Sequence, residues 1–151
     1  MTQRKYLPTF AELVDRLSIV ILKSIFIPEN KVAYEREQAD IVHDIDVLLS
    51  EKSGELQPFP KSLINGETVR AMLIIMLTNR YIWENESKAR AGGTEQDKLL
   101  KLTHSINGVR NTAKNVVSTS MGERVDLKVD ALAADLVQEF GNWQLFSPAR
   151  V

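Results

Sequence analysis

The sequence predicts an all-α protein, and three observations support this prediction. Apolar residues recur at steps of three and four along five stretches, which is the period of a helix buried on one side. No stretch shows the sustained alternation of apolar and polar residues that a half-buried strand requires. Proline or glycine stands between the stretches, and both residues end helices. We therefore expect a bundle of about five helices: two helical hairpins, then a C-terminal helix and a tail.

Length and composition are those of an ordinary globular protein. We expect a single helical domain over residues 1–151, with 44% hydrophobic and 26% charged residues. The absence of cysteine excludes disulfides, thiolate metal sites and a cysteine nucleophile. The N-terminus has no apolar core of a signal peptide, and the longest apolar run, Met72 to Leu77, is far short of the ~20 residues of a membrane span. We expect a cytoplasmic protein, and the net charge of −1 argues against nucleic-acid binding.

The first hairpin is expected to begin after Pro8. Thr9 and Glu12 fit a capping box, in which the hydroxyl and the carboxylate each satisfy a free backbone N–H. From Ile19 to Pro28 the helix is apolar nearly all round, which is typical of a helix buried on more than one side. In so small a domain this pattern predicts a subunit interface, and hence a homo-oligomer.

The next helix is expected from about Asn30 to Lys52, and an irregular connection from 53 to 65 leads to the second hairpin. Its core stripe consists of four residues: Tyr34, Ile41, Ile45 and Leu48.

The second hairpin is predicted to begin near Gly66, with Asn65 as N-cap and Gly92-Gly93 after its first helix. Residues 69–77 of that helix are expected to be core. A box-like start at Thr94 and Asp97 should open the fourth helix, whose apolar stripe is the most regular in the chain. We expect a loop over residues 118–123 and a fifth helix over about 127–140. The fourth helix's stripe comprises Leu99, Leu102, Ile106, Val109, Ala113 and Val116.

Polar residues of the third helix form a candidate wall of a binding site. At about 100° per residue, one stripe continues from the methionines into four polar or amphipathic residues. Arg80 lies near the expected core direction and can reach Glu84 one turn later. The indole ring in this stripe offers a stacking surface. The stripe comprises Asn79, Trp83, Glu86 and Arg90.

The fourth helix supplies the opposite wall. Its face away from the core holds three asparagines within nine residues, although asparagine is a weak helix former. Amides with guanidinium and ammonium groups suit a ligand that bears phosphate. The alternative is that the amides bond neighbouring helices and that Trp83 is core. The candidate residues are His104, Asn107, Arg110, Asn111 and Lys114, with Arg110 at the edge of the apolar stripe.

Charged residues on the first two helices have two interpretations. Asp15 and Arg16 are predicted to form surface or interhelical salt bridges. Glu37, Asp40 and Asp44 share one helix face, and oxygen ligands of this kind suit Mg²⁺. Helical nucleotide pyrophosphohydrolases use an ExxE and an ExxD cluster, and only the second has a counterpart here.

Two stretches carry a resemblance. Glu12 to Lys23, ELVDRLSIVILK, resembles the opening L-(I/V)-D-(R/K)-L-S-I-x-x-x-K of an uncharacterised all-helical family of bacteria and tailed phages. Residues 79–90 and 99–111 resemble the second half of small hypothetical phage proteins. The resemblance covers about a quarter of the chain. It implies a helical fold, a phage or prophage origin with a location in the host cytoplasm, and an anti-defence role such as sequestering a nucleotide signal.

The leading hypothesis is therefore non-enzymatic binding or sequestration of a small phosphorylated ligand, most simply a nucleotide, with no cofactor. The first alternative is a metal-dependent nucleotide phosphohydrolase that holds Mg²⁺ on helix two. The second is a module that acts through protein–protein contacts alone.

Overall fold

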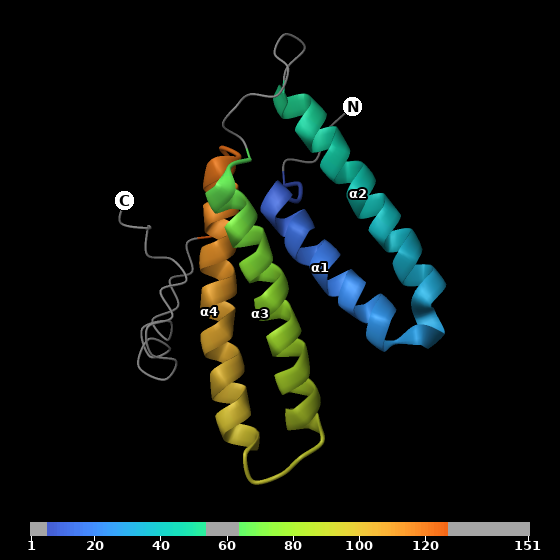
Figure 1. Ribbon diagram of the computed structural model, residues 1–151, viewed down its shortest axis with the longest axis vertical. Helices are drawn as coiled ribbons and strands as arrows, with labels where there is room; N and C mark the ends of the chain where they lie inside the picture. Colours follow the sequence, from blue (N-terminus) through green and yellow to red (C-terminus); the bar gives the residue numbers. More distant parts are fainter. Residues whose placement is uncertain (1–5, 54–63, 127–151) are drawn as a thin grey trace.

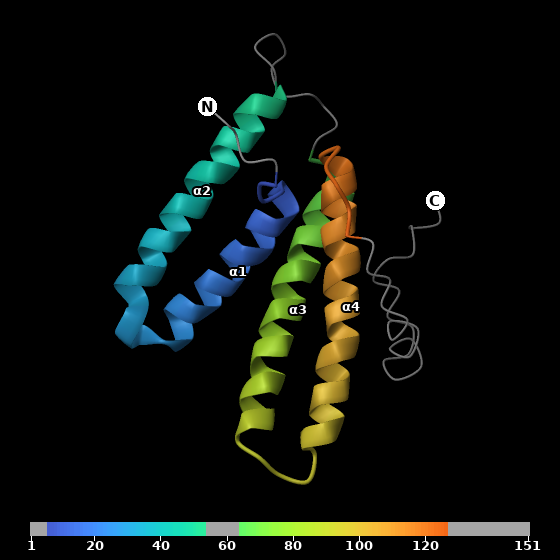
Figure 2. The same cartoon turned by 180° about the vertical axis from the view of Figure 1, so that it is seen from behind.

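The computed structural model describes residues 6–53 and 64–126, and over these residues the protein is all-α. Two helical hairpins, α1–α2 and α3–α4, make up the fold, as predicted, and Figure 1 shows α1 lying between α2 and the α3–α4 pair. The first hairpin leans away from the second toward one end, which is also clear from behind (Figure 2). The elements are α1 (Phe10–Phe26), a short 3₁₀ turn (Pro28–Asn30), α2 (Lys31–Ser53), α3 (Gly66–Arg90) and α4 (Gln96–Ser120).

The helix starts follow the local sequence closely. At α1 the Thr9 hydroxyl accepts from Glu12 N–H at 3.2 Å, and the Glu12 carboxylate accepts from Thr9 N–H at 2.8 Å. Asn65 caps α3 as predicted, and Thr68 completes the reciprocal pair. Both pairs satisfy backbone donors that a helix start leaves open.

Two predicted boundaries are wrong. Helix α4 starts at Gln96 after Glu95, which makes no side-chain cap, so the expected box at Thr94 is absent. At its other end α4 continues to Ser120 rather than ending before 118, since the Ser118 and Ser120 side chains lie on the packed and half-buried side of the helix. The predicted fifth helix and tail lie outside the described residues.

The core sits where α1, α3 and α4 meet. Its buried members include Phe10 of α1, Ile75 of α3 and Ala113 of α4. A smaller cluster of Leu13, Val20 and Ile41 joins α1 to α2, and the predicted α2 residues Tyr34, Ile45 and Leu48 pack against it. The predicted stripe of α4 is confirmed, because five of its residues are buried in or packed on the main core: Leu102, Ile106, Val109, Ala113 and Val116.

The apolar start of α3 differs from the prediction. Ile74 and Ile75 are buried, but Val69, Leu73 and Leu77 are exposed on the opposite side of the helix. A continuous run of apolar residues places apolar side chains on every side of a helix. Because α1 and α4 pack against only part of α3, the apolar side chains on its other side are exposed. Among the described residues, no helix is long and apolar enough to cross a membrane.

Candidate functional site

A network of polar side chains lies buried where three helices cross. Asn79 of α3 stands at its centre and is almost fully buried. Its amide N–H₂ donates to Asp15 Oδ1 and to Ser18 Oγ of α1, both at 2.7 Å. Its carbonyl accepts from Arg110 Nη1 of α4 at 3.0 Å. One side chain thus uses its donors on one helix and its acceptor on another, which fixes the three helices relative to one another.

Lys114 extends the network along α4. Its Nζ lies 3.3 Å from Asp15 Oδ2, and both side chains are largely buried. Asp15 is therefore shared between the Asn79 amide and the Lys114 ammonium group. The network holds two cations, Arg110 and Lys114, against one carboxylate. Arg110 Nε is buried and has no hydrogen-bond partner among the described residues.

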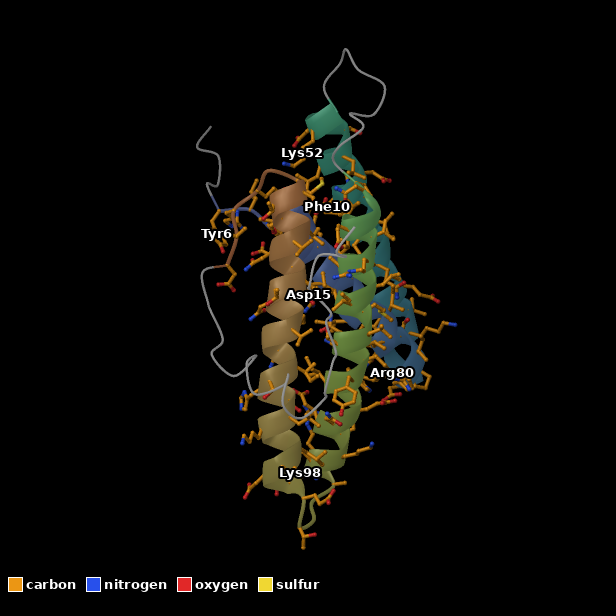
Figure 3. The ribbon with its side chains drawn as sticks, turned by 60° about the vertical axis from the view of Figure 1, so that its left-hand side comes forward. Tyr6, Phe10, Asp15, Lys52, Arg80 and Lys98 are labelled. Atoms are coloured by element: carbon orange, nitrogen blue, oxygen red, sulfur yellow. The ribbon has the colours of Figure 1, made fainter. Side chains whose placement is uncertain are left out.

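A pocket of about 350 Å³ opens beside Lys114 at the end of the bundle where α1 begins. Figure 3 shows Tyr6 at this end, next to the segment that follows α4, and Asp15 further along between the helices. The lining comes from the N-terminal segment, from α1, from the last turns of α4 and from the segment after it. It consists of Tyr6, Thr9, Glu12, Lys114, Asn115, Ser118, Arg124, Val125 and Asp126.

The Arg124 guanidinium is held over the pocket by three contacts. It stacks 4.0 Å from the centroid of the Tyr6 ring. Its Nη2 donates to the Leu7 carbonyl at 2.6 Å and to Glu12 Oε2 at 3.1 Å. Within the described residues, the hydrogen bonds of Arg124 engage only Nη2 of a group that carries five N–H donors. The other donors of Arg124 could therefore bind a ligand.

The segment after α4 is anchored on both sides of the pocket. Asn115 exchanges two hydrogen bonds with the backbone of Asp126, both at 2.9 Å. Glu123 accepts from Phe10 N–H at 2.8 Å and lies 3.5 Å from Lys52 Nζ. These bonds hold the segment that carries Arg124 at the pocket, whose lining also includes Lys114.

The residues predicted for the ligand site therefore separate into groups. Asn79, Arg110 and Lys114 come together in the buried network. Arg80 pairs with Glu84 at 2.7 Å, as predicted, and lies 4.4 Å over the Phe26 ring, while Trp83 packs near the same ring at 6.2 Å. Figure 3 shows Arg80 on the side of α3 that faces away from α4. The expectation that Arg80 points toward the core is therefore wrong.

The other predicted residues line neither the network nor the pocket. Glu86 and Arg90 form an exposed pair at 3.5 Å, and His104 is exposed. Asn107 and Asn111 are half-buried and make no side-chain hydrogen bond within the described residues. Among the described residues, the hydrogen bond from Arg110 to Asn79 is the one side-chain bond that joins the two proposed walls. The sequence predicts Lys114 on the face away from the core, but it is largely buried because Asp15 of α1 pairs with it there.

The prediction for Asp15 and Arg16 is confirmed, since each forms an interhelical ion pair. Arg16 Nε donates to Glu37 Oε1 at 2.8 Å, so Glu37 of the carboxylate row is already engaged. Asp40 is exposed, and Asp44 lies beside His43 at 3.4 Å. Within residues 6–53 and 64–126, no group of three or more histidine and acidic side chains is arranged to hold a metal ion.

The pocket itself was missed, because most of its lining is ordinary when read locally. Thr9 and Glu12 show in the sequence only as a helix cap, and Arg124 lies between the predicted loop and the predicted fifth helix with no pattern that marks it. These residues come together only through the order of the helices, because two antiparallel hairpins place the end of α4 beside the start of α1. Comparison of the chain with protein-family models, with curated proteins and with solved structures gives no match.

Proposed function

We propose that this protein binds a small phosphorylated ligand, a nucleotide in the simplest case, in the pocket beside Lys114 and does so without turnover. The observation that carries the proposal is that Lys114 of α4 and Arg124 of the segment after it line one pocket of about 350 Å³. The buried network forms its support, because Asp15 holds the Lys114 ammonium group in place.

The chemistry of the lining fits a phosphate. An ammonium group has three donors, and the bond to Asp15 uses one of them. Arg124 adds N–H groups beyond those bonded to Leu7 and Glu12. The hydroxyls of Thr9 and Ser118 complete a set of groups that recognise phosphate oxygens. Charge-assisted bonds of this kind are roughly twice as strong as neutral ones.

The size of the pocket limits the ligand. Small-molecule sites occupy about 300–1,000 Å³, so this pocket is at the small end of that range and suits a mononucleotide better than a dinucleotide. Tyr6, on which Arg124 stacks, supplies an aromatic face at the rim. The lining also holds the carboxylates of Glu12 and Asp126. Glu12 accepts from Thr9 N–H and pairs with Arg124, so it serves to cap α1 and to hold Arg124, and we propose binding alone. A protein that binds a nucleotide signal in this way sequesters it, which is the activity that the resemblance to phage proteins implies.

The test is a titration of the full chain with nucleoside mono-, di- and triphosphates by isothermal calorimetry, together with native mass spectrometry of protein purified from cells. Arg124→Gln keeps a polar side chain but removes the charge, and it should weaken binding by at least about tenfold, a loss of about 1.4 kcal/mol. Arg124 is partly exposed, so the fold should tolerate this change.

Two control variants separate this pocket from other surfaces. Arg90→Gln removes an exposed cation outside the pocket, and its affinity should equal that of the parent. Asn107→Ala should also leave the affinity unchanged, because Asn107 does not line the pocket; a loss of binding here would favour the walls predicted from the sequence instead. A parent protein that binds none of the phosphorylated compounds, or an Arg124→Gln variant that binds like the parent, would refute the proposal.

A further inference from the structure

The hydroxyl of Ser118 is an exception among the hydroxyls buried on α4. Thr103 and Ser105 each donate to the backbone carbonyl four residues earlier, at 2.9 and 3.1 Å, as such residues commonly do inside helices. Ser118 is only 4% exposed, yet its hydroxyl makes no hydrogen bond within the described residues. A polar group that is buried without a partner requires an explanation.

The pocket supplies that explanation, because Ser118 belongs to its lining together with Lys114, one turn earlier on α4. The unpaired side-chain atoms that are sealed from solvent in the described structure belong to Asn85 and Arg110. The Ser118 hydroxyl is not sealed in this way and opens on the pocket. The helix thus holds a free hydroxyl at a fixed place where a ligand can reach it.

Two further groups of the lining combine burial with donors to spare. Thr9 is 5% exposed, and its side-chain oxygen accepts from Glu12 N–H at 3.2 Å, which leaves the hydroxyl proton to donate. Lys114 is largely buried, and its pairing with Asp15 engages only part of an ammonium group that has three donors. We call Thr9, Lys114 and Ser118 the buried donor set.

We propose that the buried donor set binds one terminal phosphoryl group, so that the ligand of this pocket is a phosphomonoester; this inference rests on the function proposed above. A terminal phosphoryl group presents three strong acceptor oxygens and carries about two negative charges at pH 7. The set supplies one donor side chain for each of these oxygens. A phosphodiester, such as a cyclic mononucleotide, has only two free oxygens and would leave one buried donor without a partner, which weakens binding.

The charges around the pocket disfavour a second phosphoryl group. Lys114 and Arg124 are the cations of the described lining, and Glu12 and Asp126 are its carboxylates. Arg124 is already paired with Glu12 at 3.1 Å. Each further phosphoryl group of a di- or triphosphate adds negative charge, which meets these carboxylates and no further cation of the lining. A nucleoside monophosphate therefore fits this pocket better than its di- or triphosphate.

Calorimetric titration of the full chain tests this selectivity with each of the four ribonucleosides as its monophosphate, diphosphate, triphosphate and cyclic monophosphate. The preferred monophosphate should bind at least about tenfold more tightly than the triphosphate and the cyclic form of the same nucleoside. A parent that binds the triphosphate or the cyclic form as tightly would overturn the inference and leave the proposed function standing. A parent that binds none of the compounds would overturn both.

Ser118→Ala separates a role in binding from a role in the fold. The monophosphate should bind at least about tenfold more weakly. The midpoint of urea denaturation should equal that of the parent or rise, because the change breaks no hydrogen bond within the described residues and alanine favours the helix. Thr119→Ala is the matched control, since Thr119 is the next residue but is exposed and outside the lining. Unchanged affinity in Ser118→Ala would overturn the assignment of the buried donor set.

Asp126→Asn tests the selection by charge. The hydrogen bonds between Asn115 and Asp126 use the backbone of Asp126, so the variant keeps them while it removes a carboxylate from the lining. The triphosphate should gain about threefold in affinity relative to the monophosphate. A preference for the monophosphate that is unchanged in Asp126→Asn would contradict selection by charge.

Discussion

The two faces of α3 both depart from the usual pattern of a bundle helix. Several buried residues are polar, and several exposed residues are aliphatic. The inner face buries Ile74 and Ile75, but it buries Thr78, Asn79 and Asn85 as well. The outer face carries Val69, Leu73 and Leu77, and all three are exposed. The comparison shows that the environment of a residue in this bundle is set by the helices packed beside it, and not by its own polarity.

The inner face tolerates polar groups because the neighbouring helices supply partners. Asn79 uses its amide on Asp15 and Ser18 and its carbonyl on Arg110. Thr78 donates to the carbonyls of its own helix, at 2.8 Å to Ile74. A buried polar group with no partner costs about 1–3 kcal/mol. Asn85 Nδ2 and Arg110 Nε are the two such atoms among the described residues.

The largest effect should come from the apolar part of the inner face. Ile75 is fully buried in the main core, so Ile75→Ala removes buried methyl groups and leaves a cavity. We expect a loss of about 4 kcal/mol in the free energy of unfolding, measured by urea denaturation followed by circular dichroism. A loss below about 1 kcal/mol would show that this face is loosely packed.

A smaller effect should come from the charged part of the inner network. Asp15→Ala leaves Lys114 and Arg110 beside each other without their carboxylate, and removing one partner of a largely buried pair costs about 3 kcal/mol. The second change Lys114→Met should restore part of this loss, with a coupling of at least about 1 kcal/mol in the double-mutant cycle. Asp40→Ala, which changes an exposed acid on α2, is the control and should have little effect. Strict additivity of the two changes would mean that the pair contributes nothing to stability.

Periodicity was sufficient to predict the fold but not the site. The capping box at Thr9, the N-cap Asn65, the end of the first helix before Pro28 and the stripe of α4 each depend on residues within one or two turns. They were therefore visible in the sequence. The all-α class and the two hairpins follow from them, because short connections make neighbouring helices antiparallel.

The buried network could be predicted only in part, because its partners lie far apart in the chain. Asn79 bonds to Asp15, 64 residues earlier, and to Arg110, 31 residues later. Asn79, Arg110 and Lys114 stood out as polar residues in helical register, but the pattern gave no sign of Ser18. The assignment of Trp83 and Arg80 to the same wall did not anticipate that Phe26, at the end of α1, would pack beside both of them.

The smallest change in the free energy of unfolding should come from the outer face of α3. Leu77→Ala removes as many side-chain carbons as many core substitutions do, yet Leu77 is two-thirds exposed. At low protein concentration we expect its free energy of unfolding to lie within about 0.5 kcal/mol of the parent. Urea denaturation of both proteins, followed by circular dichroism, measures this difference. A loss above about 2 kcal/mol in Leu77→Ala would contradict the exposure of this face of α3.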